Sequence, residues 1–173
     1  MKSKEEWLKK GNDLSEKGQY EDAIGCYDKA IELDPNNSDA CYNKGDALRN
    51  LGRDADAIEC YEKAIELKPG DSDAWINKGN SLQNLGRYEE AIGSYDKAIE
   101  LKRNYSNAWF NKGIALDNLG RYEEGIGCYD KAIELTPNYS AAWINKGNAL
   151  HNLGRYDKAI ESYDKAIESY DKA

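Results

Sequence analysis

The sequence predicts an all-α solenoid, a row of paired helices in which each pair packs on the next. The first observation is a fixed period, because Trp75, Trp109 and Trp143 lie 34 residues apart. The second is that glycines and tyrosines keep this interval along the chain: Gly11, Gly45, Gly79, Gly113 and Gly147, and Tyr27, Tyr61, Tyr95, Tyr129 and Tyr163. A constant period of this length is typical of an array whose units bury their apolar faces only against neighbours.

Each unit is expected to form two helices joined by a short turn. In the third unit the first helix is predicted over residues 72–84, with Asp71 or Ser72 as its N-cap. Gly86 suits the left-handed position that follows a helix. The second helix is predicted over residues 88–102, where apolar residues recur at helical spacing.

The boundaries between units carry helix breakers. Pro35, Pro69 and Pro137 cannot continue a helix. Arg103 stands at the remaining boundary, so the second helix of the third unit is expected to run on by a residue or two. A single domain of five units follows, over approximately residues 4–37, 38–71, 72–105, 106–139 and 140–173.

The fourth unit departs from the others inside its second helix. Gly125 replaces the small packing residue that is Ala91 in the third unit, and Gly127 follows. A glycine inside a helix costs about 1 kcal/mol relative to alanine. We therefore expect this helix to be the softest of the array, and we interpret the departure as sequence drift and not as a hinge.

Two further slots repeat with the same period. Lysine fills one of them in every unit, and its methylenes are expected to cover apolar surface while the ammonium stays in water; a cationic ligand site is the alternative. These lysines are Lys10, Lys44, Lys78, Lys112 and Lys146. The other slot holds Cys26, Cys60 and Cys128 or a serine, which indicates a small packing site with free thiols, since the chain has no Cys-x-x-Cys motif.

The repeated residues resemble those of the tetratricopeptide repeat. In the third unit the family's positions are filled by Trp75, Gly79, Leu82, Ala91, Tyr95 and Ala98. The resemblance covers five tandem units and implies a right-handed superhelix with a concave groove. It also implies that function lies in that groove, because the scaffold itself is shared by many functions.

Composition excludes several classes of function. The net charge is −8, from 24 basic and 32 acidic residues, which argues against nucleic acid and membrane surfaces as partners. No apolar run approaches the roughly 18 residues of a membrane helix, and the N-terminus lacks an apolar signal core, so a cytoplasmic protein is expected. His151 is the only histidine and there is no glycine-rich phosphate loop, so we expect neither an enzyme nor a cofactor or metal.

A column of asparagines is the candidate binding site. Asn43, Asn77, Asn111 and Asn145 share one slot, and Asp46, Asn80, Ile114 and Asn148 follow three residues later. This spacing places both slots on one stripe of the first helix, which in the family lines the groove. An amide both donates and accepts, so a ladder of amides would pair with the backbone of an extended peptide. The column resembles the asparagine ladder of O-linked N-acetylglucosamine transferases. The alternative is that each amide bonds to the next repeat and binds no ligand.

Other groove positions complete the candidate site. Apolar subsites are predicted at Tyr42, Ile76, Phe110 and Ile144, and selectivity positions at Arg49, Gln83, Asp117 and His151. Unit one departs from the ladder because Lys9 holds the asparagine slot. Lys9 with Asn12 is a partial echo of the carboxylate clamp found in chaperone-binding family members, and a full clamp is not expected.

The predicted function is therefore a protein-interaction scaffold that binds an extended peptide or protein segment. The alternative is a structural array that associates through its own ends. The last helix is expected to run nearly to Ala173 and to expose an apolar stripe, with Ile160, Tyr163, Ile167 and Tyr170 as contact residues. Weak self-association would follow, by end-to-end stacking or by a pair of C-terminal helices, unless the boundary truncates a longer array.

Overall fold

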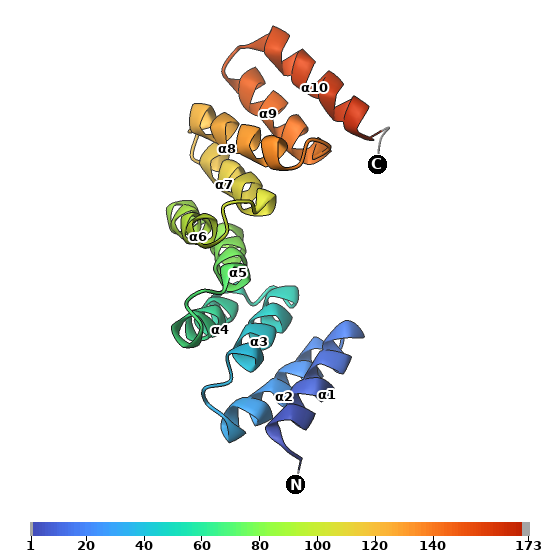
Figure 1. Cartoon of the computed structure of the whole chain (residues 1–173), viewed down its shortest axis with the longest axis vertical. Helices are drawn as coiled ribbons and strands as arrows, with labels where there is room; N and C mark the ends of the chain where they lie inside the picture. Colours follow the sequence, from blue (N-terminus) through green and yellow to red (C-terminus); the bar gives the residue numbers. More distant parts are fainter. Residues whose placement is uncertain (1, 171–173) are drawn as a thin grey trace. The chain divides into compact units, whose positions relative to one another are not determined.

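The computed structural model describes residues 2–170, and these residues form ten α-helices and no strand. In chain order the helices are α1 (Lys4–Glu16), α2 (Tyr20–Leu33), α3 (Ser38–Asn50), α4 (Asp54–Leu67), α5 (Ser72–Asn84), α6 (Tyr88–Leu101), α7 (Ser106–Asn118), α8 (Tyr122–Leu135), α9 (Ser140–Asn152) and α10 (Tyr156–Tyr170) (Figure 1). The predicted all-α fold of paired helices is confirmed. The odd-numbered helices are called A helices below and the even-numbered ones B helices.

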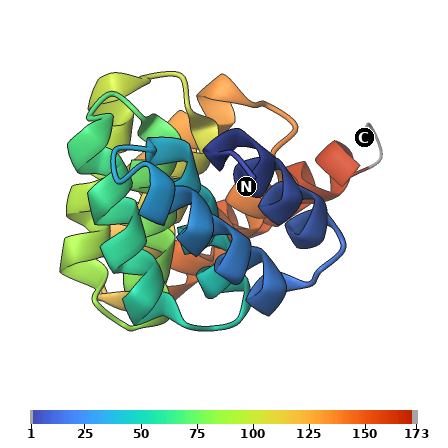
Figure 2. The ribbon, with the colours of Figure 1, turned by 90° about the horizontal axis from the view of Figure 1, so that it is seen from below.

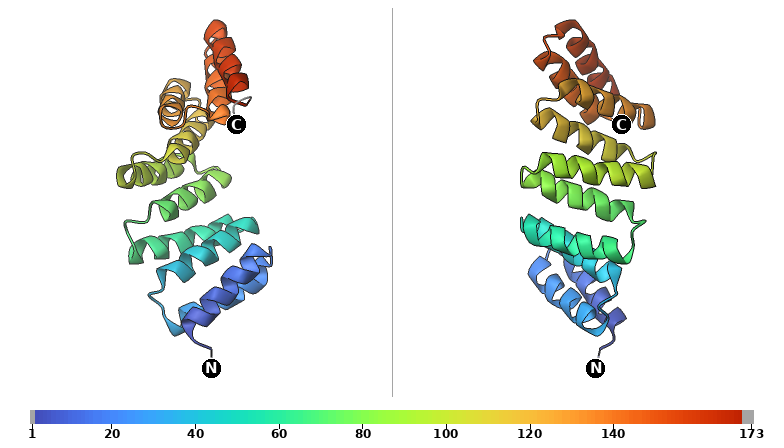
Figure 3. Two further views of the ribbon diagram at one scale, coloured as in Figure 1. Left: turned by 45° about the vertical axis from the view of Figure 1, so that its right-hand side comes forward. Right: turned by 90° about the vertical axis from the view of Figure 1, so that its left-hand side faces the viewer.

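The helices fall into two compact units, Met1–Arg87 with α1–α5 and Tyr88–Ala173 with α6–α10. Within each unit, consecutive helices lie side by side and antiparallel (Figures 2 and 3). The A helices of one unit also contact each other directly: α1 contacts α3, α3 contacts α5, and α7 contacts α9. Side chains on neighbouring A helices can therefore interact across repeats.

Local signals place the helix ends where the sequence predicts them. Helix α5 spans Ser72–Asn84, and the Asp71 side chain caps it by accepting from the backbone N–H groups of Asp73 and Ala74. Gly86 lies in the left-handed region with φ +74°, which an L side chain rarely adopts. The glycines at the equivalent turns have φ between +72° and +74°. The predicted cap and turn are confirmed.

The expected extension of the B helix before Arg103 is wrong. Helix α6 ends at Leu101, the repeat position at which α4 and α8 also end. The indole N–H of Trp109 donates to the Arg103 carbonyl at 3.3 Å, as the indole of Trp75 donates to the Pro69 carbonyl at 3.4 Å. The next A helix thus holds the connecting segment through its tryptophan, and proline is not required for the helix to stop.

In the first, second, fourth and fifth repeats a tyrosine ring packs on a glycine of the facing helix. Tyr27, Tyr61 and Tyr129 are at most 1% exposed. A Cβ atom added to Gly45 would lie 2.7 Å from Cε1 of Tyr61, well inside van der Waals contact. Only glycine lets the two helices of a repeat approach this closely.

This packing predicts opposite effects for two alanine substitutions. Gly45→Ala should lower the free energy of unfolding by about 1–3 kcal/mol, because the methyl group overpacks the core. Gly25→Ala, in a helix where an added Cβ meets nothing within 4 Å, should raise it by up to about 1 kcal/mol. Thermal and urea unfolding of both variants measures this, and equal effects would contradict the packing argument.

Candidate peptide-binding face

The asparagine column begins with a shared acceptor on α1. The Asn43 side chain donates through Nδ2 to Oδ1 of Asn12 at 2.9 Å. The buried hydroxyl of Tyr27 donates to the same oxygen at 3.0 Å. One amide oxygen therefore satisfies the core tyrosine of its own repeat and the column asparagine of the next.

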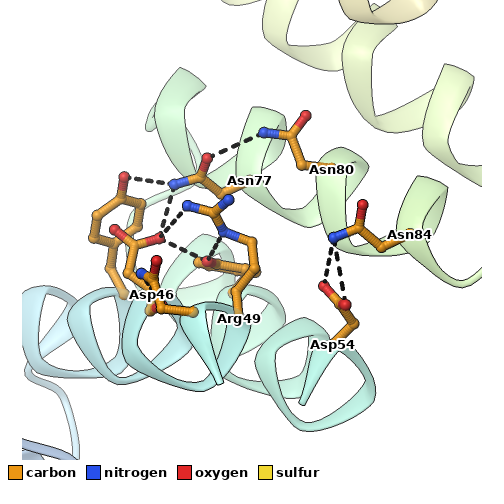
Figure 4. A network of polar contacts seen from close by, with 9 residues as sticks. Asp46, Arg49, Asp54, Asn77, Asn80 and Asn84 are labelled. Carbon is orange, nitrogen blue, oxygen red and sulfur yellow. Dashed lines mark hydrogen bonds and ion pairs between the residues drawn. The ribbon is translucent and has the colours of Figure 1, made fainter. Parts of the chain in front are cut away.

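Asp46 has the same role one repeat later (Figure 4). Its Oδ1 accepts from the Tyr61 hydroxyl at 2.6 Å and from Nδ2 of Asn77 at 2.9 Å. Asn77 also donates to the Tyr42 hydroxyl at 2.8 Å, so both of its N–H groups are used. Arg49, a predicted selectivity residue, donates to the Tyr61 hydroxyl at 3.4 Å and lies 3.9 Å from the Asp46 carboxylate. Burial raises the pKa of Asp46, and the Tyr61, Arg49 and Asn77 contacts oppose this shift.

The amides of Asn43 and Asn77 thus make the inter-repeat bonds that the alternative interpretation anticipated. Asn43 still has one N–H and its carbonyl oxygen available within the described residues, since a side-chain amide has two donors and one acceptor. Asn80 donates to Asn77 Oδ1 at 3.5 Å, and Asn111 and Asn145 are half-buried on α7 and α9. Inter-repeat bonding and peptide binding remain compatible at this column.

The fourth repeat replaces the shared acceptor by Ile114, and neighbouring residues compensate. Ile114 cannot accept a hydrogen bond, and the Tyr129 hydroxyl donates instead to Oδ2 of Asp117 at 2.6 Å. A Cβ atom at position 125 would clash with Oδ1 of Asp117, so this carboxylate occupies the space of the alanine methyl found in other repeats. The interpretation of Gly125 as drift is wrong, because glycine provides the room that Asp117 needs.

With Ile114 at this position, two polar groups make no hydrogen bond within the described residues: the amide of Asn145 and one carboxylate oxygen of Asp117. Asn145 lies 31 residues after Ile114, the separation that joins Asn43 to Asn12 and Asn77 to Asp46. Among residues 2–170 its amide has no hydrogen-bond partner. Oδ1 of Asp117 is buried and also has none within this range. Asn148 keeps the usual role, since it accepts from the Tyr163 hydroxyl at 2.8 Å.

The predicted apolar subsites differ in accessibility. Ile76 is 6% exposed, so it belongs to the core and offers a ligand little surface. Phe110 is half-buried and packs on Tyr139, with ring centroids 4.8 Å apart, and on Tyr129 at 6.0 Å. Tyr42 and Ile144 are half-buried.

The other predicted selectivity residues lie in different surroundings. Gln83 is half-buried, whereas His151 is exposed and packs edge-on against Tyr156 at 5.2 Å. Two of the asparagines that precede the turns make local bonds: Asn50 and Asn118 donate to backbone carbonyls four residues earlier, at 2.8 Å in both cases. These two asparagines therefore close the helix ends. Asn84, at the same slot, donates instead to the Asp54 carboxylate of α4 at 3.2 and 3.3 Å.

A small cavity of about 240 Å³ lies beside the first shared acceptor. Its lining residues are Asn12, Ser15, Glu16, Tyr27, Asn43 and Asp46. Sequence reasoning did not assign Glu16 to the site, although Glu16 lies one period before Asn50, at the slot that holds an asparagine in the later repeats. A larger cavity of about 530 Å³ lies between α8, α9 and α10, but no residue of the asparagine column lines it. The smaller cavity is therefore the candidate peptide-binding site.

The lysine column forms a ladder of ion pairs that sequence reasoning missed. From the second repeat on, each lysine of the column approaches an acid on the preceding B helix, 16 residues earlier: Lys44–Asp28 at 2.6 Å, Lys78–Glu62 at 2.7 Å, Lys112–Asp96 at 2.5 Å and Lys146–Asp130 at 2.6 Å. The ammonium groups of Lys78, Lys112 and Lys146 also lie 5.1–5.9 Å from the tryptophan ring three residues earlier. The constant spacing of 16 residues between the two charges was the signal that could have revealed these pairs.

Cysteine and metal chemistry do not add a site. The cysteines are free, and burial raises the pKa of the Cys60 and Cys128 thiols to about 11. Within residues 2–170 no group of three potential ligands is placed to hold a metal. In the same range, no helix has both the length and the apolar character needed to cross a bilayer.

Comparison with known proteins identifies the repeat. A tetratricopeptide repeat model matches residues 8–72 and 110–173, and a second model of that repeat matches residues 72–105. A crystal structure of MamA is 28% identical, covers 94% of this chain and 95% of its own, and has a TM-score of 0.90. YrrB, a TPR protein with an unusual peptide-binding site, is 29% identical, with 94% and 84% coverage and a TM-score of 0.81.

A third structure supports the fold alone. MamA from Desulfovibrio magneticus RS-1 is 22% identical, with 98% and 96% coverage and a TM-score of 0.92. A comparison with curated protein sequences gives no significant match.

The pairing of Gly125 with Asp117 predicts a strong coupling. Gly125→Ala should destabilise the protein by about 1–3 kcal/mol, because its methyl group meets the carboxylate. In an Asp117→Ser background the same change should stabilise by up to about 1 kcal/mol, since the clash is gone and the helix gains an alanine. Four thermal unfolding curves complete the cycle, and an equal effect of Gly125→Ala in both backgrounds would refute the pairing.

Asp117 also predicts a pH dependence. Burial raises its pKa from 3.8 to about 6, although the bond from Tyr129 lowers it. The folded state therefore holds this proton more tightly than the unfolded state, so the contribution of Asp117 to stability falls as the pH rises between 3.8 and about 6. Relative to Asp117→Asn, the wild-type melting temperature should be highest at low pH and decrease through this range. A difference that does not change with pH would be inconsistent with a buried carboxylate.

Proposed function

We propose that this chain, which belongs to the tetratricopeptide repeat family, binds an extended peptide or protein segment along the asparagine column of its A helices. Its fold and its structural neighbours are those of protein-interaction scaffolds. The observation that carries the proposal is the cavity where Asn12, Asn43 and Asp46 meet. There a polar side chain with unused donor and acceptor capacity borders open space, which suits a peptide backbone that has both groups in each residue.

Asn145 provides a second contact in the other compact unit. Ile114 stands where the first two repeats have the acceptor for the column asparagine, so the Asn145 amide makes no inter-repeat bond. A ligand backbone would therefore not have to displace an existing bond. Asn77 is the opposite case, because both of its N–H groups hold α5 against α3. The proposal therefore assigns backbone recognition to Asn43 and Asn145 and a largely structural contribution to Asn77. Asn80, Asn111 and Asn148 complete the proposed ladder, with Phe110 and Ile144 as apolar subsites.

Charge sets the expected polarity of the ligand. Glu5, Asp39 and Asp73 are exposed at the same slot of successive A helices in Met1–Arg87, whereas Asn107 and Ala141 occupy that slot in the other unit. We expect a ligand's basic residues to lie over the first unit. Attraction between exposed charges is screened by salt, so binding should weaken as ionic strength rises.

The test uses linear peptides selected from a random display library on the full chain. Asn43→Ala and Asn145→Ala should each weaken binding about threefold to tenfold, the value of one hydrogen bond. The melting temperature should change little for Asn145→Ala and should fall by about 2–4 °C for Asn43→Ala, which also loses its bond to Asn12. Asn118→Ala, which alters only a bond that closes a helix end, is the matched control and should bind normally. Selected peptides that bind equally well to both ladder variants, or that show no preference for basic residues, would exclude this account.

Self-association is the second candidate function, and the surface of α10 favours it. Ile160, Ile167 and Tyr170 are 58%, 62% and 67% exposed, and Tyr163 is half-buried beside them. Helix α10 reaches Tyr170 as expected, while Ala173 lies outside the described residues. Exposed contiguous apolar surface usually marks a contact site.

Sedimentation across a concentration series tests this candidate. If α10 mediates self-association, the association should be weak and reversible, and Ile167→Asp combined with Tyr170→Asp should abolish it, because charges on the stripe oppose its burial. A strict monomer at high concentration, or a dimer that the double variant leaves unchanged, would rule out association through α10.

A further inference from the structure

Helix α10 exposes a face that the other B helices bury or half-bury. Ile160 and Ile167 are more than half exposed, whereas Ile58 and Ile99, at the same repeat positions, are 6% and 9% exposed. Within the described residues α10 packs only on α9 (Figure 1). This face of α10 can therefore accept another helix, and the helices that cover the equivalent face in other repeats show which side chains fit it.

The helix that covers this face elsewhere presents a fixed pattern. On α3, Ala47 packs against the core tyrosine of α2, and Lys44 pairs with Asp28 of α2 at 2.6 Å. Ala40, three residues into the same helix, is fully buried. Together these positions read Ala-x-x-x-Lys-x-x-Ala. Helix α9 repeats the pattern against α8 with Ala142, Lys146 and Ala149.

Helix α1 of a second copy does not carry this pattern. Its residues at the two alanine positions are Glu6 and Asp13, and both are exposed. Stacking α1 onto α10 would take two carboxylates out of water without a designed partner, at a cost of several kcal/mol. End-to-end stacking of copies is thus disfavoured by the side chains of α1.

Two copies of α10 also fit each other poorly. Asp157 and Asp164 lie next to Ile160 on the helix surface, three residues before it and four after it. A pair of α10 helices would bury the stripe with these acids at its margin. Asp164 is at the repeat position of Asp28 and Asp130, each of which pairs with a lysine of the covering helix. The two acids at the edge of the apolar stripe therefore favour a partner helix that carries a basic residue.

We propose that the open face of α10 docks an amphipathic helix of a partner protein whose contact surface reads Ala-x-x-x-Lys-x-x-Ala. The small residues lie on Tyr163 and the apolar stripe, and the lysine pairs with Asp164. This site is separate from the asparagine column, and the proposal does not rest on peptide binding there.

The chain itself supplies the probe and its matched control. The probe is a labelled peptide with the α9 sequence, residues 140–152, titrated against the full-length chain by fluorescence anisotropy. The control peptide has the α1 sequence, residues 4–16, which has the same length and the same helix register. The α9 peptide should bind at least about tenfold more tightly, because the α1 peptide would bury its two carboxylates.

Protein variants locate the contact. Ile167→Asp should remove binding of the α9 peptide, and circular dichroism should show an unchanged fold, since this side chain is exposed. Asp164→Lys should weaken binding up to about fivefold, the range of an exposed ion pair, and should improve binding of a peptide with glutamate at the lysine position. Glu59→Lys makes the same charge change at an exposed position of α4 and should have no effect.

Three results would overturn the proposal. They are equal binding of the two peptides, binding that Ile167→Asp leaves intact, and a dimer formed through α10 that excludes the peptide. If the asparagine variants left the binding of groove ligands unchanged, the proposal for α10 would still stand or fall on the α9 peptide experiment, because the two experiments probe different surfaces.

Discussion

The buried hydroxyl of the core tyrosine is the interaction on which the rest of this structure depends. The ring fills the space above a glycine, and burial there obliges its O–H to find an acceptor. That acceptor comes from the A helix of the same repeat, as Asn12 does for Tyr27 and Asp46 for Tyr61. In Met1–Arg87 the same oxygen also receives the column asparagine of the next A helix. In the first two repeats, core packing, repeat stacking and the polar surface are thus linked through one oxygen atom each.

The fourth repeat shows how far this constraint reaches. Loss of the acceptor at Ile114 is accompanied by Asp117, which accepts from Tyr129, and by Gly125, which makes room for Asp117. Asn145 is then left with an unused amide within the described residues. A substitution that looks like drift in one helix is therefore part of a set that spans three helices, and it changes which asparagine is available to a ligand.

Sequence periodicity predicts the fold well because the signals that set it are local. The cap at Asp71 and the turn at Gly86 each depend on residues within a few positions. The stop before Arg103 and the reason for Gly125 depend on side chains from another helix, Trp109 and Asp117, so no local pattern contains them. Sequence likewise places the asparagines on one stripe, but it does not show that the amide of Asn77 is already committed to neighbouring repeats.

A double-mutant cycle on Tyr61→Phe and Asp46→Ala tests the central claim most directly. Both changes remove the shared hydrogen bond, so once one is made the other should cost less. Urea unfolding of the four proteins should give a coupling free energy of about 1–3 kcal/mol, as expected for a hydrogen bond to a charged group. Additivity of the two substitutions within about 0.5 kcal/mol would contradict the account, because the hydroxyl would then be independent of its acceptor.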